Sequence, residues 1–520
     1  MATRSANEYQ VVVVGFGPSG AVAANLLGAH GIRTLAVDRD RSVYDKPRAI
    51  ALDHEIFRLL DNLGVAERLR PYIAPFPASE HFGAQGQLIR RIDMVSEPYP
   101  LGYTPTMVFT QPPVEEILRD HARAQASVTV ELGTELRQLS QTKDGVTLEL
   151  QGDDGTTRSV TADYVIACDG ASSGVRRQLG IGFDDLVFDE PWLVVDLMVN
   201  GSGLAKLPKT AAQFCEPARP TSYIVGPGPH RRFEIMLSPG EDPRAMERPE
   251  QVWRLLARWL TPEDATLWRA ASYRFHALVA ETWRDGRIFL AGDAAHQQPP
   301  FIGQGMCQGI RDVANLAWKL EQVLRGQSSD ALLDTYQDER SAHVRELTGR
   351  IKAIGHVICE RDPDAAAARD ARILAEGGGT PRTITRQEIV PPLAHGLLAT
   401  AAHAANGTLF PQPWLRTEAG RRLLDSVCGT GWRLVLAADN AMARSREIAA
   451  QAGELGLRVI RIASGDAADA VREDDGVVTN WFGKHGCAAA IVRPDHYVYG
   501  VADDATSLAA MLSDLKARLS

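Results

Sequence analysis

The first clear pattern in the chain is an apolar run that stops at a glycine. Residues 11–14 are four consecutive valines, and the spacing Gly15-x-Gly17-x-x-Gly20 follows at once. A continuous β-branched run of this length is typical of a strand in a parallel sheet covered on both faces. Residues 21–27 then predict a helix, and residues 34–37 predict a second strand that ends at Asp38. The N-terminus is therefore expected to begin with a β-α-β unit.

Later segments carry different periodicities. Runs at 192–197, 211–215, 221–225 and 232–237 predict strands separated by Gly/Pro turns, and hence an antiparallel sheet. Apolar residues recur at helical spacing over 313–324, and Gly326 is a suitable stop for that helix. Residues 362–391 are rich in Ala, Arg, Asp and Gly, which indicates a connection between domains. Beyond it, strands are expected at 431–436, 457–461, 488–495 and 497–500, followed by a helix over 507–519.

Composition narrows the class of protein. The 520 residues include 56 Lys and Arg against 65 Asp and Glu, which gives a net charge of −9 and disfavours a nucleic-acid or membrane partner. No segment resembles a signal peptide or is long enough to span a bilayer. The six cysteines show neither a Cys-x-x-Cys pair nor a spacing suited to zinc, so no metal site is expected. A cytoplasmic enzyme with reduced thiols is the interpretation that these features favour.

The glycine spacing predicts a dinucleotide site. Gly15 makes the tight turn, Gly17 lets a pyrophosphate approach the backbone, and Gly20 lets the helix pack against the strand. Pro18 and Ser19 open a helix whose free N–H groups would face the phosphates. Asp38, 18 residues after the last glycine, suits the ribose hydroxyls, with Arg39 beside it. On these residues alone, the ligand could be NAD or FAD.

Four further segments give the chain a specific resemblance. Arg48, Gln111 in Phe-Thr-Gln-Pro, Asp169-Gly170 after a strand-like run, and Gly292-Asp293 in Ala-Gly-Asp-Ala-Ala-His resemble motifs of the group A flavoprotein aromatic monooxygenases. In that family, the resemblance implies, these segments contact FAD: the Asp-Gly pair at the pyrophosphate and the Gly-Asp aspartate at the ribityl chain. Taken singly, Asp169-Gly170 could be a turn and Asp293 a helix N-cap; their order and separation favour the cofactor. Asp38 departs from the glutamate found in many members.

A glycine-containing loop is expected to border the flavin. Residues 299–306, here called the glycine loop, contain Pro300, Gly303, Gln304, Gly305 and Met306. Its glycines would let the backbone lie against a planar ring, and the helix that follows would aim its N-terminus at the reduced flavin. A second phosphate-binding loop is the alternative interpretation. His296 is expected to be structural or close to the cofactor.

The resemblance implies a function: NAD(P)H reduces FAD, and a flavin C4a-hydroperoxide then hydroxylates a phenolic ring. FAD, NADH or NADPH, O2 and a small aromatic substrate are thus the expected ligands, without a nucleic-acid or membrane partner. The motifs are most similar to those of the 3-(3-hydroxyphenyl)propionate hydroxylase and polyketide hydroxylase groups. A fused-ring substrate, a flavin reductase, a non-catalytic FAD-binding protein and a halogenase are alternatives, although no Trp-x-Trp motif of the halogenases is present. The sequence leaves the oligomeric state open, and a homodimer is one alternative.

The expected fold class is α/β, with a Rossmann-like FAD-binding domain of the glutathione-reductase type, an inserted antiparallel sheet and a thioredoxin-like C-terminal domain. The expected bounds are 1–182 and 281–360 for the FAD-binding domain, 183–280 for the substrate sheet, 361–400 for a connection and 401–520 for the last domain. Trp192, Phe214, Tyr223, Phe233 and Phe301 are candidate pocket residues, although each could be ordinary core. The side chains that could polarise a phenol are Tyr223, His230 and His276.

Overall fold

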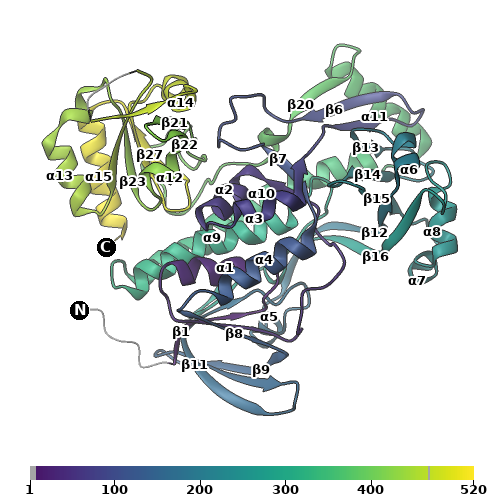
Figure 1. The fold of residues 1–520 in the computed structure, drawn as a ribbon, viewed down its shortest axis with the longest axis horizontal. Helices are drawn as coiled ribbons and strands as arrows, with labels where there is room; N and C mark the ends of the chain where they lie inside the picture. The colour runs from purple at the N-terminus through teal and green to yellow at the C-terminus, as the bar shows by residue number, and fades with distance from the viewer. Residues whose placement is uncertain (1–7, 466–468, 520) are drawn as a thin grey trace.

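The computed structural model describes residues 8–465 and 469–519. Three sheet-containing parts are visible in Figure 1: an N-terminal α/β domain, a large sheet beside it, and a separate C-terminal domain at the upper left. The mixed α/β architecture confirms the expected fold class.

The N-terminal domain is built on a mostly parallel sheet with the order β17-β18-β11-β1-β2-β8, and β9 and β10 extend it as an antiparallel hairpin. β1 pairs in parallel with both β2 and β11, and β11 pairs in parallel with β18. Its strands are β1 (Tyr9–Val14), β2 (Thr34–Asp38), β8 (Val128–Leu132), β9 (Thr134–Gln141), β10 (Val146–Gly152), β11 (Thr157–Ala167), β17 (Arg284–Asp285) and β18 (Ile288–Leu290). The expected strands at 11–14 and 34–37 are thus confirmed.

Helices of this domain pack over the sheet and against one another. α1 lies against α4 and α9, and α9 against α10. They are α1 (Pro18–Ala29), α2 (His54–Asn62), α3 (Ala66–Leu69), α4 (Gln111–Arg123), α5 (Gly174–Gln178), α9 (Gly305–Leu324) and α10 (Asp334–Cys359). A small sheet of β3 (Ala51–Asp53), β7 (Thr106–Phe109) and β4 (Ile73–Pro75) lies in the same region.

The second sheet has nine strands and draws on more of the chain than residues 183–280. Its order is β19-β16-β12-β15-β14-β13-β5-β6-β20. The strands are β19 (His296–Gln297), β16 (Ala265–Ala280), β12 (Phe183–Val199), β15 (His230–Met236), β14 (Thr221–Val225), β13 (Ala211–Phe214), β5 (Ser79–Phe82), β6 (Leu88–Asp93) and β20 (Arg382–Thr385). The four strands expected from the sequence are present, and β5, β6, β19 and β20 join them from outside the expected bounds.

The two faces of this sheet have different neighbours because side chains alternate along each strand. Trp192 and Val194 belong to a buried cluster with Phe301 and Ile302 of the glycine loop. The intervening Leu193 and Val195 pack in a cluster beneath the short helices α7 (Pro243–Met246) and α8 (Pro249–Leu256); α6 is Gly201–Lys206. One face therefore looks toward the glycine loop and the other toward α8.

Residues 361–400 are more ordered than the expected connection. They form α11 (Pro363–Glu376), β20 and a short 3-10 turn at Arg386–Ile389. Asp362 caps α11 by accepting the Ala365 N–H at 2.8 Å, and Pro363 occupies the first turn. Alanine favours helix, so the composition that suggested a linker instead supports a helical segment that packs on the sheet.

The C-terminal domain has a seven-stranded mixed sheet with the order β22-β21-β25-β24-β23-β26-β27. Its elements are β21 (Trp414–Thr417), β22 (Gly420–Leu423), α12 (Leu424–Cys428), β23 (Arg433–Ala437), α13 (Arg446–Glu454), β24 (Arg458–Ala463), β25 (Val471–Glu473), α14 (Val477–His485), β26 (Ala489–Val492), β27 (Val498–Ala502) and α15 (Ala505–Leu519). Parallel β23–β25 beside antiparallel β26 and β27 agrees with the expected thioredoxin-like order.

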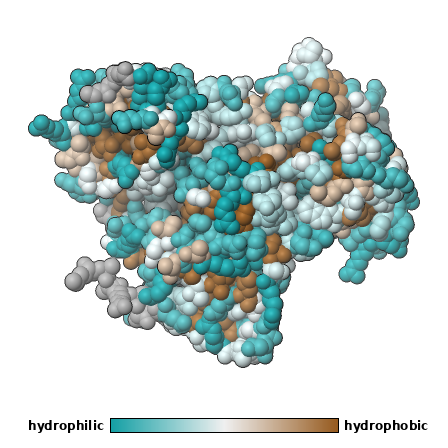
Figure 2. Space-filling model, viewed as in Figure 1, coloured by the Kyte–Doolittle hydropathy of each residue, from teal (hydrophilic) through white to brown (hydrophobic). Residues whose placement is uncertain are grey.

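The surface view in Figure 2 shows hydrophilic residues over much of one face, with hydrophobic groups interspersed between them. Among the helices of residues 8–465 and 469–519, none combines the length and apolar character needed to cross a bilayer. The six cysteines are all free thiols.

Candidate functional site

The three glycine motifs meet at one edge of the parallel sheet. Val14 pairs with Ala167, and Ala167 pairs with Leu290, so β1, β11 and β18 end side by side. Gly15 directly follows the end of β1, and Asp169 and Gly292 each come two residues after the last residue of β11 or β18. The carboxyl ends of adjacent parallel strands are where ligands bind in open α/β sheets. The tertiary structure thus brings together motifs that are nearly three hundred residues apart in the sequence.

Two of the N-terminal glycines are required by backbone packing. Gly15 has φ +93°, and a Cβ there would lie 2.3 Å from the Cys168 carbonyl oxygen. A Cβ on Gly20 would lie 1.9 Å from the Gly15 carbonyl oxygen. Gly17 is different, because a Cβ at that position would meet no atom within 4 Å. Its bare backbone at the start of α1 faces open space, which suits the close approach of a pyrophosphate.

The helices α1 and α9 start beside each other at this edge. Ser19 on α1 touches both Gly292 and Gly309, since a Cβ on Gly309 would lie 2.3 Å from the Ser19 hydroxyl oxygen. No side chain caps the first turn of either helix. Their N–H groups and the positive ends of their dipoles are therefore available to an anionic or electron-rich ligand.

Buried polar atoms without partners lie near both ends of the expected nucleotide site. Asp169 accepts the Val175 N–H through Oδ2 at 3.0 Å, whereas its buried Oδ1 has no hydrogen-bond partner among the described residues. Arg119 of α4 is buried, and its Nε and Nη1 are likewise unpartnered. Buried polar groups are nearly always hydrogen-bonded, so these orphans fit the phosphate and hydroxyl groups of FAD.

The Asp38 carboxylate is held in a fixed position at the end of β2. It accepts the Phe16 N–H at 2.7 Å and the Asp40 N–H at 2.8 Å, and Arg119 Nη2 lies 3.8 Å away. Arg39 is exposed next to it. Arg119 was not predicted from the sequence. Its spacing from Gln111 and Glu115, four residues per step on one face of α4, was the available signal.

Asp293 and Gly170 present open positions. Asp293 is exposed to solvent. The protein atoms packed around its carboxyl group nevertheless raise its pKa by desolvation, and His296 and Arg48 oppose the rise. It receives no hydrogen bond within the described part of the chain. Gly170 has φ +79° and open space at its Cβ position. A free carboxylate in this place suits the hydroxyls of a ribityl chain.

The Gln111 side chain holds the backbone around Arg48 through hydrogen bonds. Its Oε1 accepts the N–H groups of Arg48 and Ala49 at 2.8 and 2.6 Å, and its Nε2 donates to Glu115 at 3.1 Å. From the other side, Arg232 of the nine-stranded sheet donates to the Arg48 carbonyl oxygen at 2.7 Å. The Arg48 guanidinium is left exposed. The structure therefore places Gln111 as a brace for the segment that carries Arg48.

The glycine loop closes this region. Gly303 has φ +63°, a Cβ there would lie 2.5 Å from Ala51 Cβ, and a Cβ on Gly305 would meet nothing within 4 Å. Gln304 is buried at the start of α9 and accepts a hydrogen bond from Arg311 at 2.8 Å. Met306 lines a small apolar pocket between α1, α4 and α9, and Pro300 accepts the Gly303 N–H at 2.7 Å. The loop offers open backbone on one side and a fixed support on the other.

Tyr223 lies away from this loop. It faces the α8 side of the sheet, packs against Phe233 with ring centroids 5.0 Å apart, and donates to the Pro208 carbonyl oxygen at 3.2 Å. Strand alternation places it on the face opposite Trp192 and Val194. The expectation that Tyr223 polarises a phenol at the loop is therefore not supported by its position. Phe214 stacks on Phe82 and also lies away from the loop cluster.

Aromatic side chains pack between the nine-stranded sheet and the glycine loop. Trp192 stacks on Phe275 at 5.6 Å, and Phe301 meets both rings edge-on at 5.7 and 6.2 Å. Phe188 contacts Phe301 at 5.8 Å. Of the five candidate pocket residues, only Trp192 and Phe301 belong to this group.

A row of buried polar side chains crosses the loop-facing side of the sheet. It consists of His81, Gln213, Ser222 and Glu234, which are successive cross-strand partners, and is called the polar row here. Glu234 is flanked on this face by Val194 and Met236, which pack in the cluster of Phe301 and Ile302. Burial raises the pKa of Glu234 to about 7, against the pull of Arg232. Because the row forms only when the strands pair, no local sequence pattern predicts it.

The two buried histidines of the sequence analysis are held by carboxylates. His296 Nε2 lies 2.7 Å from Asp312 Oδ2 and its ring stacks on Trp283. His230 Nε2 lies 2.8 Å from Asp196 Oδ1. His276 is paired with Asp189 at 3.4 Å on the outer part of the sheet. These contacts support a structural role for His296 and His230.

Comparisons with known proteins agree with this geometry. Residues 8–350 match the FAD binding domain family, and residues 407–518 match the HcaD C-terminal domain family. A Rhodococcus jostii protein named "Probable NADH-specific resorcinol 4-hydroxylase" is 37% identical over 512 residues, covering 98% of this chain and 94% of that protein. A Burkholderia vietnamiensis 3-(3-hydroxy-phenyl)propionate/3-hydroxycinnamic acid hydroxylase is 34% identical, covering 99% of this chain and 98% of that protein.

A solved structure extends the likeness to three dimensions. The ternary complex of aklavinone-11 hydroxylase with FAD and aklavinone has a TM-score of 0.79 and 26% identity, covering 98% of this chain and 99% of that one. The agreement over nearly the full length includes the C-terminal domain.

Proposed function

The chain belongs to the FAD binding domain family and is an FAD-dependent aromatic hydroxylase, and from this premise we propose that its substrate is a single-ring phenol and its reductant NADH. The overall reaction joins the phenol, O2, NADH and a proton to give the hydroxylated ring, NAD+ and water. The proposal is supported by the resemblance to the resorcinol hydroxylase over 98% of the chain. A cytoplasmic location, where NADH is supplied, follows from the same proposal.

FAD, when bound, supplies the oxygen-transfer chemistry, and the chain supplies the positions around it. Gly17 and the start of α1 would hold the pyrophosphate, Asp38 the ribose, and Asp293 the ribityl chain. Gly305 and the first turn of α9 would lie at the flavin ring with their N–H groups directed toward it. These roles are supported by the open backbone at Gly17 and Gly305, the fixed carboxylate of Asp38 and the free carboxylate of Asp293.

We place the phenol between the glycine loop and the polar row. Trp192, Phe275 and Phe301 occupy much of the space beside the loop, which favours one aromatic ring over a fused system. Their packing also keeps water from the reacting region, which suppresses wasteful release of peroxide. The polar row supplies hydrogen-bonding groups on an otherwise apolar face, as binding a phenol requires.

Glu234 is the residue that we assign to the phenolic hydroxyl. It is the only carboxyl group of the polar row, and with its pKa raised to about 7 it can accept a proton near neutral pH. Drawing the proton from the phenol increases electron density in the ring, which favours attack on an electrophilic oxygen. The observation that carries this assignment is the buried position of Glu234 next to Val194 and Met236 on the loop-facing side.

A substrate panel tests the proposal. The holoenzyme is given resorcinol, 3-(3-hydroxyphenyl)propionate or a fused-ring phenol, with NADH or NADPH, and NADH oxidation, H2O2 and product mass are measured. We expect a single-ring phenol to accelerate NADH oxidation and to gain one oxygen atom per NADH consumed. Product from the fused-ring compound alone would favour the polyketide alternative. NADH oxidation that yields only H2O2 with every phenol would refute the proposal.

A further inference from the structure

The support beneath the glycine loop reaches into the C-terminal domain. We propose that Tyr497 of that domain is a positioning residue for the glycine loop, acting through Glu55 and Arg311 on Gln304. This gives the C-terminal domain a part in setting the flavin site, and it rests on the proposed function in that the loop borders the flavin.

Arg311 is the centre of this arrangement. From α9 it donates to Gln304 Oε1 at 2.8 Å through Nη1 and to Glu55 Oε2 at 2.6 Å through Nε, and its Nη2 pairs with Asp53. All four side chains are buried. The planar guanidinium thus fixes the first turn of α9 relative to α2 and β3. Because Gln304 stands between Gly303 and Gly305, this contact sets the position of the open backbone of the loop.

Tyr497 completes the set from the other domain. Its hydroxyl donates to Glu55 Oε1 at 2.8 Å, and the ring is buried just before β27. Burial, reinforced by the nearby Glu55 charge, raises the pKa of Tyr497 well above its ordinary value, so the hydroxyl keeps its proton and remains a donor. Each oxygen of the Glu55 carboxylate therefore has one partner, Arg311 on one side and Tyr497 on the other.

The energetic reason lies in the burial of Glu55. Burial, together with the charge of Asp53, raises the pKa of Glu55, and Arg311 and the Tyr497 hydroxyl oppose that rise. Removing the hydroxyl leaves one buried carboxylate oxygen without a hydrogen-bond partner, and an unsatisfied buried oxygen lowers the free energy of unfolding. The carboxyl group can respond only by turning or taking up a proton, and either response weakens its bond to Arg311. Arg311 is then held less firmly and in turn holds Gln304 less firmly.

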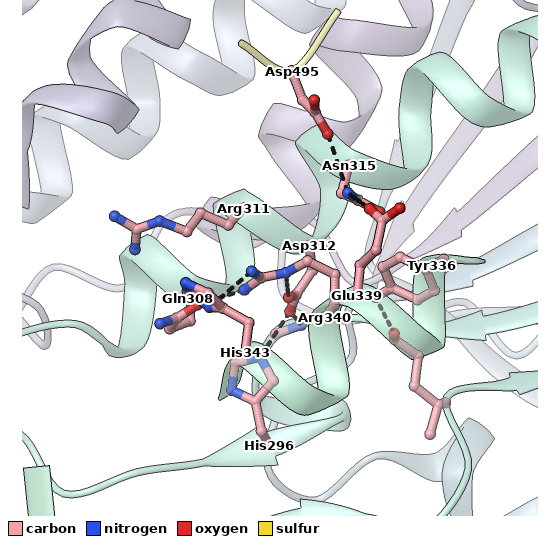
Figure 3. A network of polar contacts seen from close by, with 12 residues as sticks. His296, Gln308, Arg311, Asp312, Asn315, Tyr336, Glu339, Arg340, His343 and Asp495 are labelled. Carbon is pink, nitrogen blue, oxygen red and sulfur yellow. Dashed lines mark hydrogen bonds and ion pairs between the residues drawn. The ribbon is translucent and has the colours of Figure 1, made fainter. Parts of the chain in front are cut away.

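Other contacts between the two domains do not depend on Tyr497. Asn315, further along α9, donates to Glu339 at 2.6 Å and to Asp495 of the C-terminal domain at 3.1 Å, as Figure 3 shows. Arg58 of α2 binds Asp425 through two hydrogen bonds of 2.7 and 2.9 Å. These pairs hold the domains together, so loss of the Tyr497 hydroxyl should change the glycine loop while leaving the domains docked.

The chain offers a matched control for the test. Tyr499 is buried two residues away, and its hydroxyl donates to Asp514 within the C-terminal domain. Tyr497→Phe and Tyr499→Phe therefore each remove one buried hydroxyl from the same domain, and only the first touches the set that leads to Gln304. Holoenzymes of both variants are compared with the unchanged protein.

Three measurements separate positioning from stability. They are the visible circular dichroism of bound FAD without substrate, the Kd for FAD, and the H2O2 formed per NADH with a phenol present. For Tyr497→Phe we expect an altered dichroism spectrum, a Kd raised about fivefold, as the loss of one net hydrogen bond would give, and a severalfold rise in H2O2. Tyr499→Phe should match the unchanged protein in all three, although it also loses a hydrogen bond and its Tm falls.

A double variant tests the route. Tyr497→Phe combined with Gln304→Ala should show less than the sum of the two single effects on the Kd, because both act through Arg311. Additive effects, or identical spectra and Kd values for the Tyr497 and Tyr499 variants, would overturn the proposal. The spectra and Kd are measured without substrate. Failure of every phenol to be hydroxylated would therefore refute the proposed function and leave this inference standing or falling on its own data.

Discussion

Replacing Glu234 by glutamine should make the stability of this protein less sensitive to pH. Glu234 is buried on the loop-facing side of the nine-stranded sheet, where burial raises its pKa from 4.5 to about 7. The charged groups that act on it are Arg232, whose Nη1 lies 3.9 Å from Oε1, and Asp196 on the neighbouring strand. Glutamine has nearly the same shape and carries no charge at any pH, so the exchange isolates the ionisation.

The size of the effect follows from the shift in pKa. One pKa unit corresponds to about 1.4 kcal/mol, so a rise of this extent amounts to about 3 kcal/mol. Between pH 4.5 and 7 the folded protein binds the proton of Glu234 and the unfolded chain has lost it, and the free energy of unfolding therefore falls as the pH rises. Above pH 7 the full penalty is present. The glutamine variant is free of it.

The assay compares Tm at pH 5 and pH 8.5. The Glu234→Gln and unchanged proteins should have similar Tm at pH 5, and the variant should be the more stable one at pH 8.5 by several degrees. Glu250→Gln removes an exposed carboxylate from α8 in the same domain and controls for a change in total charge. Equal destabilisation of Glu234→Gln at both pH values would refute a raised pKa and, with it, Glu234 as a proton acceptor.

Other changes separate the cofactor residues from their supports. Gly17→Ala should fold normally, because nothing lies within 4 Å of the new Cβ, yet bind FAD at least about tenfold more weakly. Unchanged FAD binding by this variant would contradict the pyrophosphate assignment. Gly20→Ala, whose Cβ collides with the Gly15 carbonyl, should lower the Tm as well. Asp293→Ala should stay folded and lose FAD on gel filtration, and full flavin occupancy would speak against its ribityl role. Tyr223→Phe should leave kcat and KM unchanged at a loss of about 1 kcal/mol in stability, and a large fall in kcat would return Tyr223 to the active site.

Local sequence was sufficient to predict those elements whose structure is decided by residues close together in the chain. The valine run, the glycine spacing and Asp38 predicted β1, α1 and β2 because strand, turn and helix are decided within about thirty residues. The helical repeat and Gly326 predicted the end of α9 in the same way. Local signals failed over residues 361–400, where β20 becomes a strand by pairing with β6, far away in the sequence.

The choice of face was also beyond the sequence. Tyr223 and Glu234 both lie on predicted strands, yet one packs under α8 and the other lies in the polar row. A shift of one residue in a strand moves a side chain to the opposite face, and only the paired sheet fixes which face meets the glycine loop. For this reason the sequence made Tyr223 a candidate for contact with a phenol and did not single out Glu234.

The sequence by itself therefore determined the fold class and the type of cofactor, because the glycines and acids of the motifs that predict them lie at turns and strand ends of their own local segments. Only the tertiary structure decided that Glu234 lies on the loop-facing side of the sheet and that Tyr497 contacts Glu55 beneath the loop. Those contacts join residues up to 442 positions apart. Their free energy depends on burial between packed domains, and burial is a property of the assembled fold that no local pattern contains.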